Sequence, residues 1–178
     1  MPSLTIHEIK QYSKWESNIF IETGTYMGDT LYNVMNHFDR LYSIELSETY
    51  ANQARKRFND KVSIIQGDSS VILKPLANEV NGSIFFWLDG HWSGGDTAKG
   101  DKDCPLMEEI QTIHNNYKKR CIVAIDDVRL FGTNVNENWS TITRENVLYI
   151  VKDRLLSCEY FPSTLYAEDR MVLHLKEI

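Results

Sequence analysis

The segment FIETGTYMGDT, Phe20 to Thr30, carries the strongest structural signal in this chain. A short apolar run ends at Glu22, two glycines follow at Gly24 and Gly28, and the next residues have the pattern of a helix. Glycines in such a turn let the backbone adopt unusual dihedral angles and approach a ligand closely. The segment therefore predicts a strand, a ligand-binding turn and the start of a helix.

The same alternation of short apolar runs and longer amphipathic segments continues along the chain. Strands are expected within 18–24, 40–46, 61–68, 82–90 and 121–127, and helices within 29–38, 47–58, 69–80, 104–117 and 143–156. Repeated strand–helix units predict an α/β fold, with a doubly wound, mostly parallel seven-stranded sheet and helices on both faces. The closing segments 158–165 and 169–178 predict an antiparallel strand pair at the sheet edge, joined by a tight turn.

Composition narrows the class of protein. The chain has 178 residues without a linker or repeat, which suits one domain spanning 1–178. A net charge of −6 argues against a protein that binds nucleic acid or an anionic membrane, because those partners select a basic face. The three cysteines form no CxxC pair, and no signal peptide or membrane-length apolar run is present. We expect a cytoplasmic protein with reduced thiols.

Carboxylates end each of the first five expected strands. In parallel sheets with helices on both faces, ligands bind outside the carboxyl ends of the strands. Chance or solvation explains two or three acidic residues at such ends, but an acid at all five favours function. These residues are Glu22, Glu45, Asp68, Asp89 and the pair Asp126–Asp127.

The spacing Glu22-x-Gly24-x-x-x-Gly28 departs from the GxGxxG pattern of dinucleotide-binding turns. An acid before the first glycine repels a pyrophosphate but suits a ligand with an ammonium group. Glu45 ends the second strand, where an acid accepts hydrogen bonds from ribose hydroxyls. An adenosine that carries an amino-acid tail is S-adenosylmethionine (SAM), which we expect as the cofactor.

The motifs FIETGTYMGDT, YSIEL, QGDSS and FFWLDGH resemble, in order, those of the Rossmann-like (class I) SAM-dependent methyltransferases, over Ile19 to Asp127. The family's first motif reads E/DxGxGxG, and here Tyr26 stands at the middle glycine. The resemblance implies that the first turn wraps the methionine tail, that Glu45 holds the ribose, and that Asp68 and Ser69 face the adenine. The implied cofactor-binding residues are Glu22, Gly24, Thr25, Tyr26, Met27, Gly28, Glu45, Leu46, Gly67, Asp68, Ser69 and Asp89.

Asp89, Asp126 and Asp127 follow the fourth and fifth strands and offer three hard oxygen ligands. Their arrangement is similar to that of catechol O-methyltransferase and of metal-dependent sugar O-methyltransferases. That resemblance implies a Mg²⁺ site that binds substrate oxygens and lowers the pKa of a hydroxyl. In the alternative interpretation, Asp126 caps the following loop or accepts hydrogen bonds from backbone amides.

His91 follows Asp89 by two residues, and these two are the expected catalytic residues. An imidazole titrates near neutral pH and can take a hydroxyl proton, but His91 as a metal or substrate contact, or as a purely structural residue, stays open. The loops 93–103 and 129–139 are expected to wall the substrate site. Trp92, Lys99 and Arg129 are their candidate contacts.

The sequence thus predicts a methyltransferase that acts on an oxygen of a small molecule, such as a sugar or a glycan precursor. The short chain leaves little room for a lid, so we expect an open pocket or one completed by a second copy in a homo-oligomer. A nicotinamide-dependent oxidoreductase predicts GxGxxG and a substrate domain, and neither is found. A non-catalytic SAM-binding protein has no reason to cluster three aspartates. Methylation of nucleic-acid bases is disfavoured by the charge and by the lack of an Asn/Asp-Pro-Pro-aromatic motif.

Overall fold

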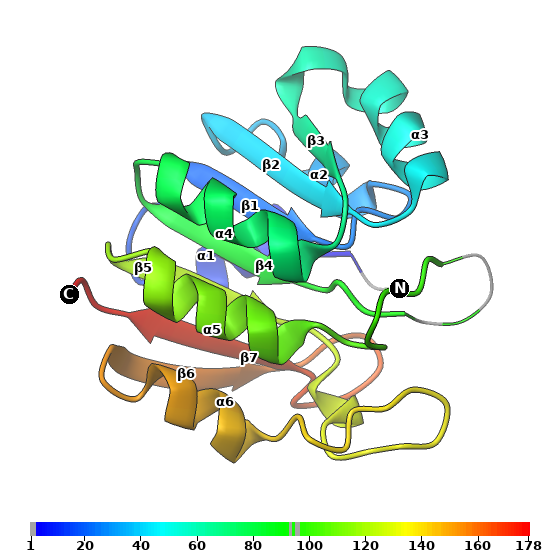
Figure 1. The fold of residues 1–178 in the computed structure, drawn as a ribbon. Coiled ribbons are helices and arrows are strands. Elements are labelled where there is room, and N and C mark those ends of the chain that lie inside the picture. Colours follow the sequence, from blue (N-terminus) through cyan, green and yellow to red (C-terminus); the bar gives the residue numbers. More distant parts are fainter. Residues whose placement is uncertain (1–2, 93, 95–96) are drawn as a thin grey trace.

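The computed structural model describes residues 3–92, 94 and 97–178, and its centre is a seven-stranded sheet (Figure 1). The strand order is β3-β2-β1-β4-β5-β7-β6. The strands are β1 (Ile19–Thr23), β2 (Arg40–Glu45), β3 (Ser63–Gln66), β4 (Ile84–Leu88), β5 (Cys121–Ile125), β6 (Leu155–Phe161) and β7 (Arg170–Leu175). The α-helices are α1 (Ile6–Tyr12), α2 (Asp29–Val34), α3 (Glu48–Phe58), α4 (Ser69–Glu79), α5 (Leu106–Asn116) and α6 (Arg144–Val151).

The sheet confirms the predicted α/β class. Strands β1 to β5 are parallel, and β7 pairs antiparallel with both β5 and β6. The final strand therefore inserts between β5 and β6, and β6 forms the sheet edge. The connection between β6 and β7 is longer than the predicted tight turn. Pro162 directly follows β6 and lacks the N–H group that would continue the ladder.

Two hydrophobic cores cover the two faces of the sheet. In β1, Ile19 and Ile21 face the core beneath α4, α5 and α6, whereas Phe20 faces the core beneath α1, α2 and α3. This alternation is the period of two that a strand imposes on its side chains. Figure 1 shows α4, α5 and α6 lying over one face. Because both faces are covered, β4 and β5 are apolar and buried along their whole length.

Helix α1 is an element that we did not predict. Thr5 caps it by accepting a hydrogen bond from the Glu8 backbone N–H, while the Glu8 side chain accepts one from the Thr5 N–H at 2.8 Å. This reciprocal arrangement is a capping box, and the spacing Thr-x-x-Glu is its sequence signature. Ile9 and Tyr12 bury the inner side of the helix against the sheet.

Helix α6 ends at Val151, before the expected end at 156, and β6 already begins at Leu155. Arg154 is fully buried, and its guanidinium donates to the carbonyls of Tyr117 and Lys119 at 2.6 Å each. It fastens this bend to the end of α5. The longest described helices have 11 residues, and none combines the length and apolar character needed to span a bilayer.

Candidate functional site

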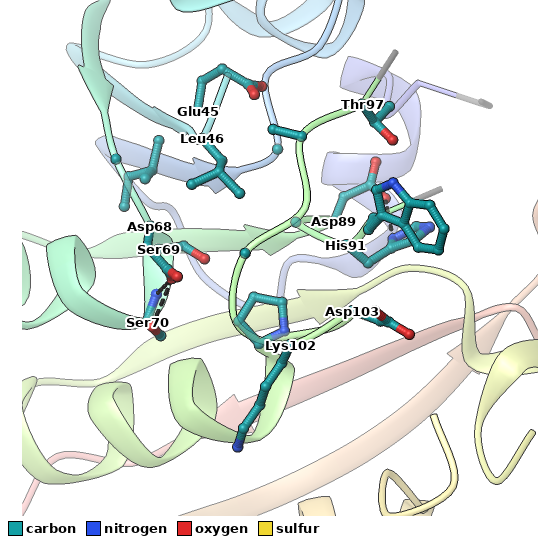
Figure 2. Close-up of a pocket in the computed structure, with 18 of the residues that line it drawn as sticks. Glu45, Leu46, Asp68, Ser69, Ser70, Asp89, His91, Thr97, Lys102 and Asp103 are labelled. Carbon is teal, nitrogen blue, oxygen red and sulfur yellow. Dashed lines mark hydrogen bonds and ion pairs between the residues drawn. The ribbon is translucent and has the colours of Figure 1, made fainter. Parts of the chain in front are cut away.

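A pocket opens at the carboxyl ends of β1 to β4, where the sequence predicted a ligand. Figure 2 shows Asp68 to Ser70 on one side of it and Asp89 and His91 on the other. Eight of the predicted cofactor residues line this pocket: Gly24, Tyr26, Glu45, Leu46, Gly67, Asp68, Ser69 and Asp89. The loop after β4 closes the remaining side with residues that include Trp92, Thr97, Gly100 and Asp103.

The turn after β1 is held in a conformation that few residues tolerate. Gly24 has φ +85°, and a Cβ atom there would lie 2.5 Å from the Asp89 carbonyl oxygen. The position therefore requires glycine for both its dihedral angle and the close approach of β4. Tyr26, at the family's middle glycine, also has a positive φ of 47°. Backbone strain of this kind is concentrated at ligand sites.

Glu45 organises this turn from the end of β2. Its Oε2 accepts the backbone N–H groups of Thr25 at 3.0 Å and Tyr26 at 2.9 Å, and its Oε1 accepts that of Ser47 at 2.8 Å. A carboxylate oxygen has two lone pairs, so Oε1 can accept one more hydrogen bond from a ligand hydroxyl. Glu45 thus holds the turn and still offers an acceptor.

Asp68 caps α4 on the opposite side of the pocket. Its Oδ1 accepts hydrogen bonds from the Ser70 backbone at 2.9 Å and from the Ser70 hydroxyl at 2.6 Å. Gly100 approaches the other oxygen, since a Cβ there would lie 3.1 Å from Asp68 Oδ2. The loop after β4 therefore packs closely against Asp68 at this wall of the pocket.

Four predicted cofactor residues do not line the pocket: Glu22, Thr25, Met27 and Gly28. Glu22 is 1% exposed and accepts a hydrogen bond from Ser43 at 2.6 Å. Burial raises the pKa of Glu22 to about 8. The Thr25 hydroxyl also contacts Ser43, Met27 is half exposed, and Gly28 precedes α2. These four residues belong to the turn and its flanks but do not face the pocket.

Tyr50 is a pocket residue that the sequence analysis missed. It lies in the first turn of α3, five positions after Glu45, and its ring packs on that of Tyr26 with centroids 4.8 Å apart. The strand–helix pattern could have identified Tyr50. The first turn of a helix that follows a strand with a ligand-binding carboxyl end lies at the same edge of the sheet as that strand end.

Asp89 and His91 form one corner of the pocket (Figure 2). Their side chains are 12% and 4% exposed, and Asp89 Oδ1 lies 3.8 Å from His91 Nδ1. Asp89 Oδ1 is buried and has no hydrogen-bond partner among the described residues. Burial, reinforced by the nearby Asp126 and Asp127, raises the pKa of Asp89 well above its ordinary range.

His91 is approached by two further carboxylates on its other nitrogen. Nε2 lies 3.3 Å from Asp127 Oδ2 and 3.8 Å from Glu137 Oε2. Trp139 packs edge-on against the imidazole at 5.1 Å and donates its indole N–H to Glu137. Trp139 is 2% exposed, so it supports this corner by packing. Glu137 was not named among the predicted site residues, although it lies in the loop 129–139 that was expected to wall the substrate site.

Asp126 lines a small cavity together with Asp89 and His91, but its carboxylate is paired with Arg170. Its Oδ1 accepts a hydrogen bond from Arg170 Nε at 3.3 Å, and Arg170 also contacts Glu8 and Tyr12 of α1. Arg129, a predicted anion contact, instead pairs with Asp127 and Asp169. The charges of Asp126 and Arg129 are therefore engaged within the protein.

The loop after β4 is joined to the loop after β5 through Asp103. Its carboxylate accepts the Asn138 backbone N–H at 2.8 Å and pairs with Lys99 at 2.7 Å. The Lys99 ammonium lies over the Trp92 ring, 4.4 Å from its centroid. Part of this predicted substrate loop, Ser93, Gly95 and Asp96, lies outside the described residues.

Comparisons with known proteins bear on the fold. No protein-family model and no curated protein sequence matches this chain. Among solved structures it is similar to CalS10, an amino pentose methyltransferase from Micromonospora echinaspora, with 11% identity over 96% of this chain and 88% of that one, and a TM-score of 0.64. The glycopeptide N-methyltransferase MtfA gives 10% identity, coverage of 97% and 92%, and a TM-score of 0.59. An rRNA methylase from Streptococcus thermophilus has 15% identity over 100% of this chain and 99% of that one, and a TM-score of 0.56.

These similarities extend over nearly the whole chain. The chain therefore has the fold of the class I SAM-dependent methyltransferases. CalS10 and MtfA contain SAM, whereas their acceptors differ from each other and from rRNA. The shared fold leaves the acceptor to be argued from this chain's own residues.

Proposed function

We propose that this protein is a SAM-dependent methyltransferase that methylates an oxygen of a small hydroxylated molecule, such as a sugar or a glycan precursor. One observation carries the proposal. A single pocket joins the strained Gly24 turn, the Glu45 carboxylate and the Asp68–Ser69 cap to the buried corner of Asp89 and His91. The first three fit a nucleoside with an amino-acid tail, and the last fits a reacting hydroxyl.

The residues fit SAM in several ways. A Cβ at Gly24 or Gly100 would lie 2.5 or 3.1 Å from a neighbouring oxygen atom, so both glycines allow the backbone to pack closely at the pocket wall. Glu45 Oε1 has a lone pair left for a ribose hydroxyl. The described hydrogen bonds to Asp68 reach only Oδ1, so Oδ2 suits a donor such as the adenine amino group. Tyr26 and Tyr50 add an aromatic wall.

Bound SAM supplies an electrophilic methyl group on a sulfonium. The protein's part is to align the acceptor oxygen with that methyl group and to exclude water, since alignment supplies much of the rate of such a displacement. The Gly24 backbone lies against the Asp89 carbonyl, so the cofactor turn and the acceptor corner have a fixed relative position. Asp89 and His91 are the groups we assign to the reacting hydroxyl. His91 serves there as the acceptor of the hydroxyl proton.

A small polar acceptor suits the rest of the wall. Trp92, Lys99 and Asp103 together present an aromatic face, an ammonium and a carboxylate next to the corner. Sugars are bound by this mixture of apolar face and polar edge. CalS10, with a similar fold, acts on an amino pentose. The net charge of −6 argues against a nucleic-acid acceptor.

Calorimetric titration of the purified protein with SAM, its demethylated product and NADH tests the cofactor. We expect micromolar binding of the first two and none of NADH. Glu45→Ala should abolish binding, because it removes the acceptor that holds the turn and faces the ribose. Glu48→Ala, an exposed acid three residues later, should bind like the wild type. If the wild type bound neither SAM nor its product, the proposal would be wrong.

An acceptor screen then tests the reaction. Nucleotide-linked and free sugars are incubated with SAM labelled in its methyl group, and label transferred to the sugar identifies the substrate. We expect transfer to a hydroxyl, seen as an ether methyl signal by NMR. Label found only on nitrogen would contradict the assignment to oxygen.

A further inference from the structure

A small cavity adjoins the corner of Asp89 and His91 on the side away from the ligand pocket. About 10 Å³ of it is open to the centre of a water molecule, and three carboxyl groups line it, those of Asp89, Glu109 and Asp126. Asp89, Gly90 and His91 line both the pocket and the cavity, so they form the partition between the two. A molecule in the cavity therefore touches the back of the acceptor corner.

Two oxygen atoms on the wall of this cavity need a hydrogen-bond donor. Asp89 Oδ1 and Glu109 Oε1 are buried, and neither has a hydrogen-bond partner among the described residues. The distance of 3.8 Å from Asp89 Oδ1 to His91 Nδ1 is too long for a hydrogen bond. The hydroxyls of Thr23 and Ser69 approach the Glu109 carboxylate, but neither donates to Oε1. Buried oxygens ordinarily have a donor, and one small molecule between the two would supply it to both.

We propose that one water molecule is bound in this cavity, is hydrogen-bonded to both Asp89 and Glu109, and fixes the Asp89 carboxylate beside His91. Glu109 is then a positioning residue, because it acts on the acceptor corner only through the water and Asp89. Its part in methyl transfer rests on the proposed function, whereas the binding of the water does not.

The size and polarity of the cavity suit one water molecule. A bound water needs about 10–15 Å³ of such space and two to four polar partners, whereas purely apolar cavities stay dry. This cavity has room for a single water and has carboxyl oxygens on its wall. The rest of the wall includes four buried side chains that separate it from solvent: Leu88, Cys104, Leu106 and Trp139.

The carboxylate of Asp89 is held less firmly than the other pocket carboxylates. Glu45 accepts three backbone hydrogen bonds, and Asp68 accepts two hydrogen bonds from Ser70. No comparable donor reaches Asp89 from within the described ranges. A water anchored on Glu109 supplies the missing contact, and Asp89 then keeps one orientation toward His91.

Glu109 is well placed to anchor that water. It is 1% exposed in the first turn of α5, and its backbone N–H donates to the Pro105 carbonyl at 3.0 Å. Its carboxylate lies near Thr23 at the end of β1 and near Ser69 at the start of α4. A side chain packed between regular elements is positioned more precisely than one on a loop.

The charges around the cavity favour a protonated Glu109. The Asp126 carboxylate is paired with Arg170, but no lysine or arginine pairs with Glu109 in the part of the chain that the structure describes. Burial, with Asp68 and Glu108 nearby, raises the pKa of Glu109 to about 7. A protonated Glu109 can donate its O–H to the water, which leaves the water protons free for Asp89.

A crystal structure of the purified protein, at a resolution that shows ordered water, tests the binding of the water. We expect one density peak in the cavity, roughly 2.8 Å from Asp89 Oδ1 and from Glu109 Oε1. An empty cavity, or a water that contacts only one of the two residues, would overturn the inference. A peak at about 2.1 Å from several oxygens would be a metal ion and would overturn it as well.

Two substitutions of Glu109 test its positioning role in the same way. Glu109→Met keeps the approximate size of the side chain but removes its hydrogen bonds, so the water should be lost and the Asp89 carboxylate should turn. Glu109→Gln keeps a carbonyl and adds an N–H donor, so the water and Asp89 should stay in place. Gln111→Met, at an exposed position of the same helix, should resemble the wild type. An unchanged Asp89 orientation in Glu109→Met would show that Glu109 does not position it.

The rate of methyl transfer to the sugar found in the acceptor screen gives a second measure. For Glu109→Met, kcat should fall about tenfold to hundredfold, because a small displacement of a group at the reacting atom has an effect of this size. Glu109→Gln should restore most of kcat. Glu109→Met should also resist urea at pH 7 at least as well as the wild type, since it removes a buried ionisable group. A loss of rate without a loss of stability is not expected of a purely structural residue, and an unchanged kcat would overturn the positioning role.

SAM titration of the same samples separates this inference from the proposed function. A water between Asp89 and Glu109 in a protein that does not bind SAM supports the bound water and contradicts the proposed function. SAM binding by a protein whose cavity is empty contradicts the bound water and leaves the proposed function intact.

Discussion

Glu45 and Tyr26 are joined by a 2.9 Å hydrogen bond in which the Tyr26 backbone N–H donates to the Glu45 carboxylate. The bond links the end of β2 to a residue in the left-handed region, which a tyrosine adopts only at an energetic cost. Thr25 donates to the same oxygen, so the turn is held at two consecutive amides. The acid expected to bind ribose therefore also shapes the turn.

Glu45→Gln should test this double role. Glutamine keeps one acceptor but turns its NH₂ group toward a backbone N–H, either in the turn or at Ser47. An unsatisfied buried donor costs about 1–3 kcal/mol, so the free energy of unfolding should fall by that amount. SAM affinity should fall by at least about tenfold, since a turn that is held less well binds less tightly. Urea unfolding and calorimetry measure the two effects, and Glu48→Gln should change neither.

Gly24→Ala should be far more damaging than alanine at another glycine of similar φ. Gly24 and Gly132 have φ of +85° and +76°, but only Gly24 has backbone within 3 Å of an added Cβ. Gly132→Ala should cost about 1–2 kcal/mol from its dihedral angle alone. Gly24→Ala should cost at least about 3 kcal/mol, because it also pushes against the Asp89 carbonyl. Equal changes in unfolding free energy would show that the close contact does not matter.

Glu109 should make the protein less stable as the pH rises. It is 1% exposed in the first turn of α5, and burial raises its pKa from 4.5 to about 7. The folded state therefore holds a proton that the unfolded state has lost between these values. The contribution of Glu109 to stability should be largest below pH 4.5 and fall toward pH 7, by at most about 1.4 kcal/mol per pH unit.

Glu109→Gln should remove this loss, so its advantage over the wild type should grow from pH 5 to pH 7. Urea unfolding at pH 5, 6 and 7 measures the difference. Glu79→Gln, on an exposed position of α4, should follow the wild type at every pH. A constant difference between Glu109→Gln and the wild type would contradict the assigned pKa.

Arg154→Met should destabilise the protein strongly without touching the pocket. The Arg154 guanidinium and Nε donate to carbonyls at the end of α5 and at Lys176, and the residue is fully buried. Leaving such carbonyls unpaired costs about 1–3 kcal/mol each, so we expect a loss of at least about 3 kcal/mol. Arg144→Met, which breaks an exposed pair with Glu168, should cost under about 1 kcal/mol. Thermal unfolding of both variants checks the contrast.

The α/β class and the edge of the sheet that carries the ligand residues could be predicted, because both follow from the alternation of apolar runs and helical segments along the chain. Each apolar run became a strand, and Glu45, Asp68 and Asp89 lie at or just beyond strand ends. Helix α1 was also within reach, since Thr5 and Glu8 have the spacing of a capping box. Helix α1 has only 7 residues, so its apolar periodicity is too short to be recognised in the sequence.

The direction in which each carboxylate points could not be predicted. Glu22 and Asp126 follow the same pattern as Glu45, yet Glu22 faces Ser43 and Asp126 faces Arg170. Both partners come from strands far away in sequence, and only the folded sheet brings them close. Glu137 reaches His91 from an irregular loop, for which periodicity gives no signal.

The contacts of Arg170 form late in protein synthesis, because β7 is synthesised after β1 to β6. Arg170 lies in β7 and contacts Glu8, 162 positions earlier, and Asp126, 44 positions earlier. The ribosome releases β1 to β5 first, so the nascent chain has an open edge at β5 and an Asp126 without its counter-ion. Contacts this distant in sequence form slowly. We therefore expect the nascent chain to need protection at that edge until the last strand emerges and completes the active face of the sheet.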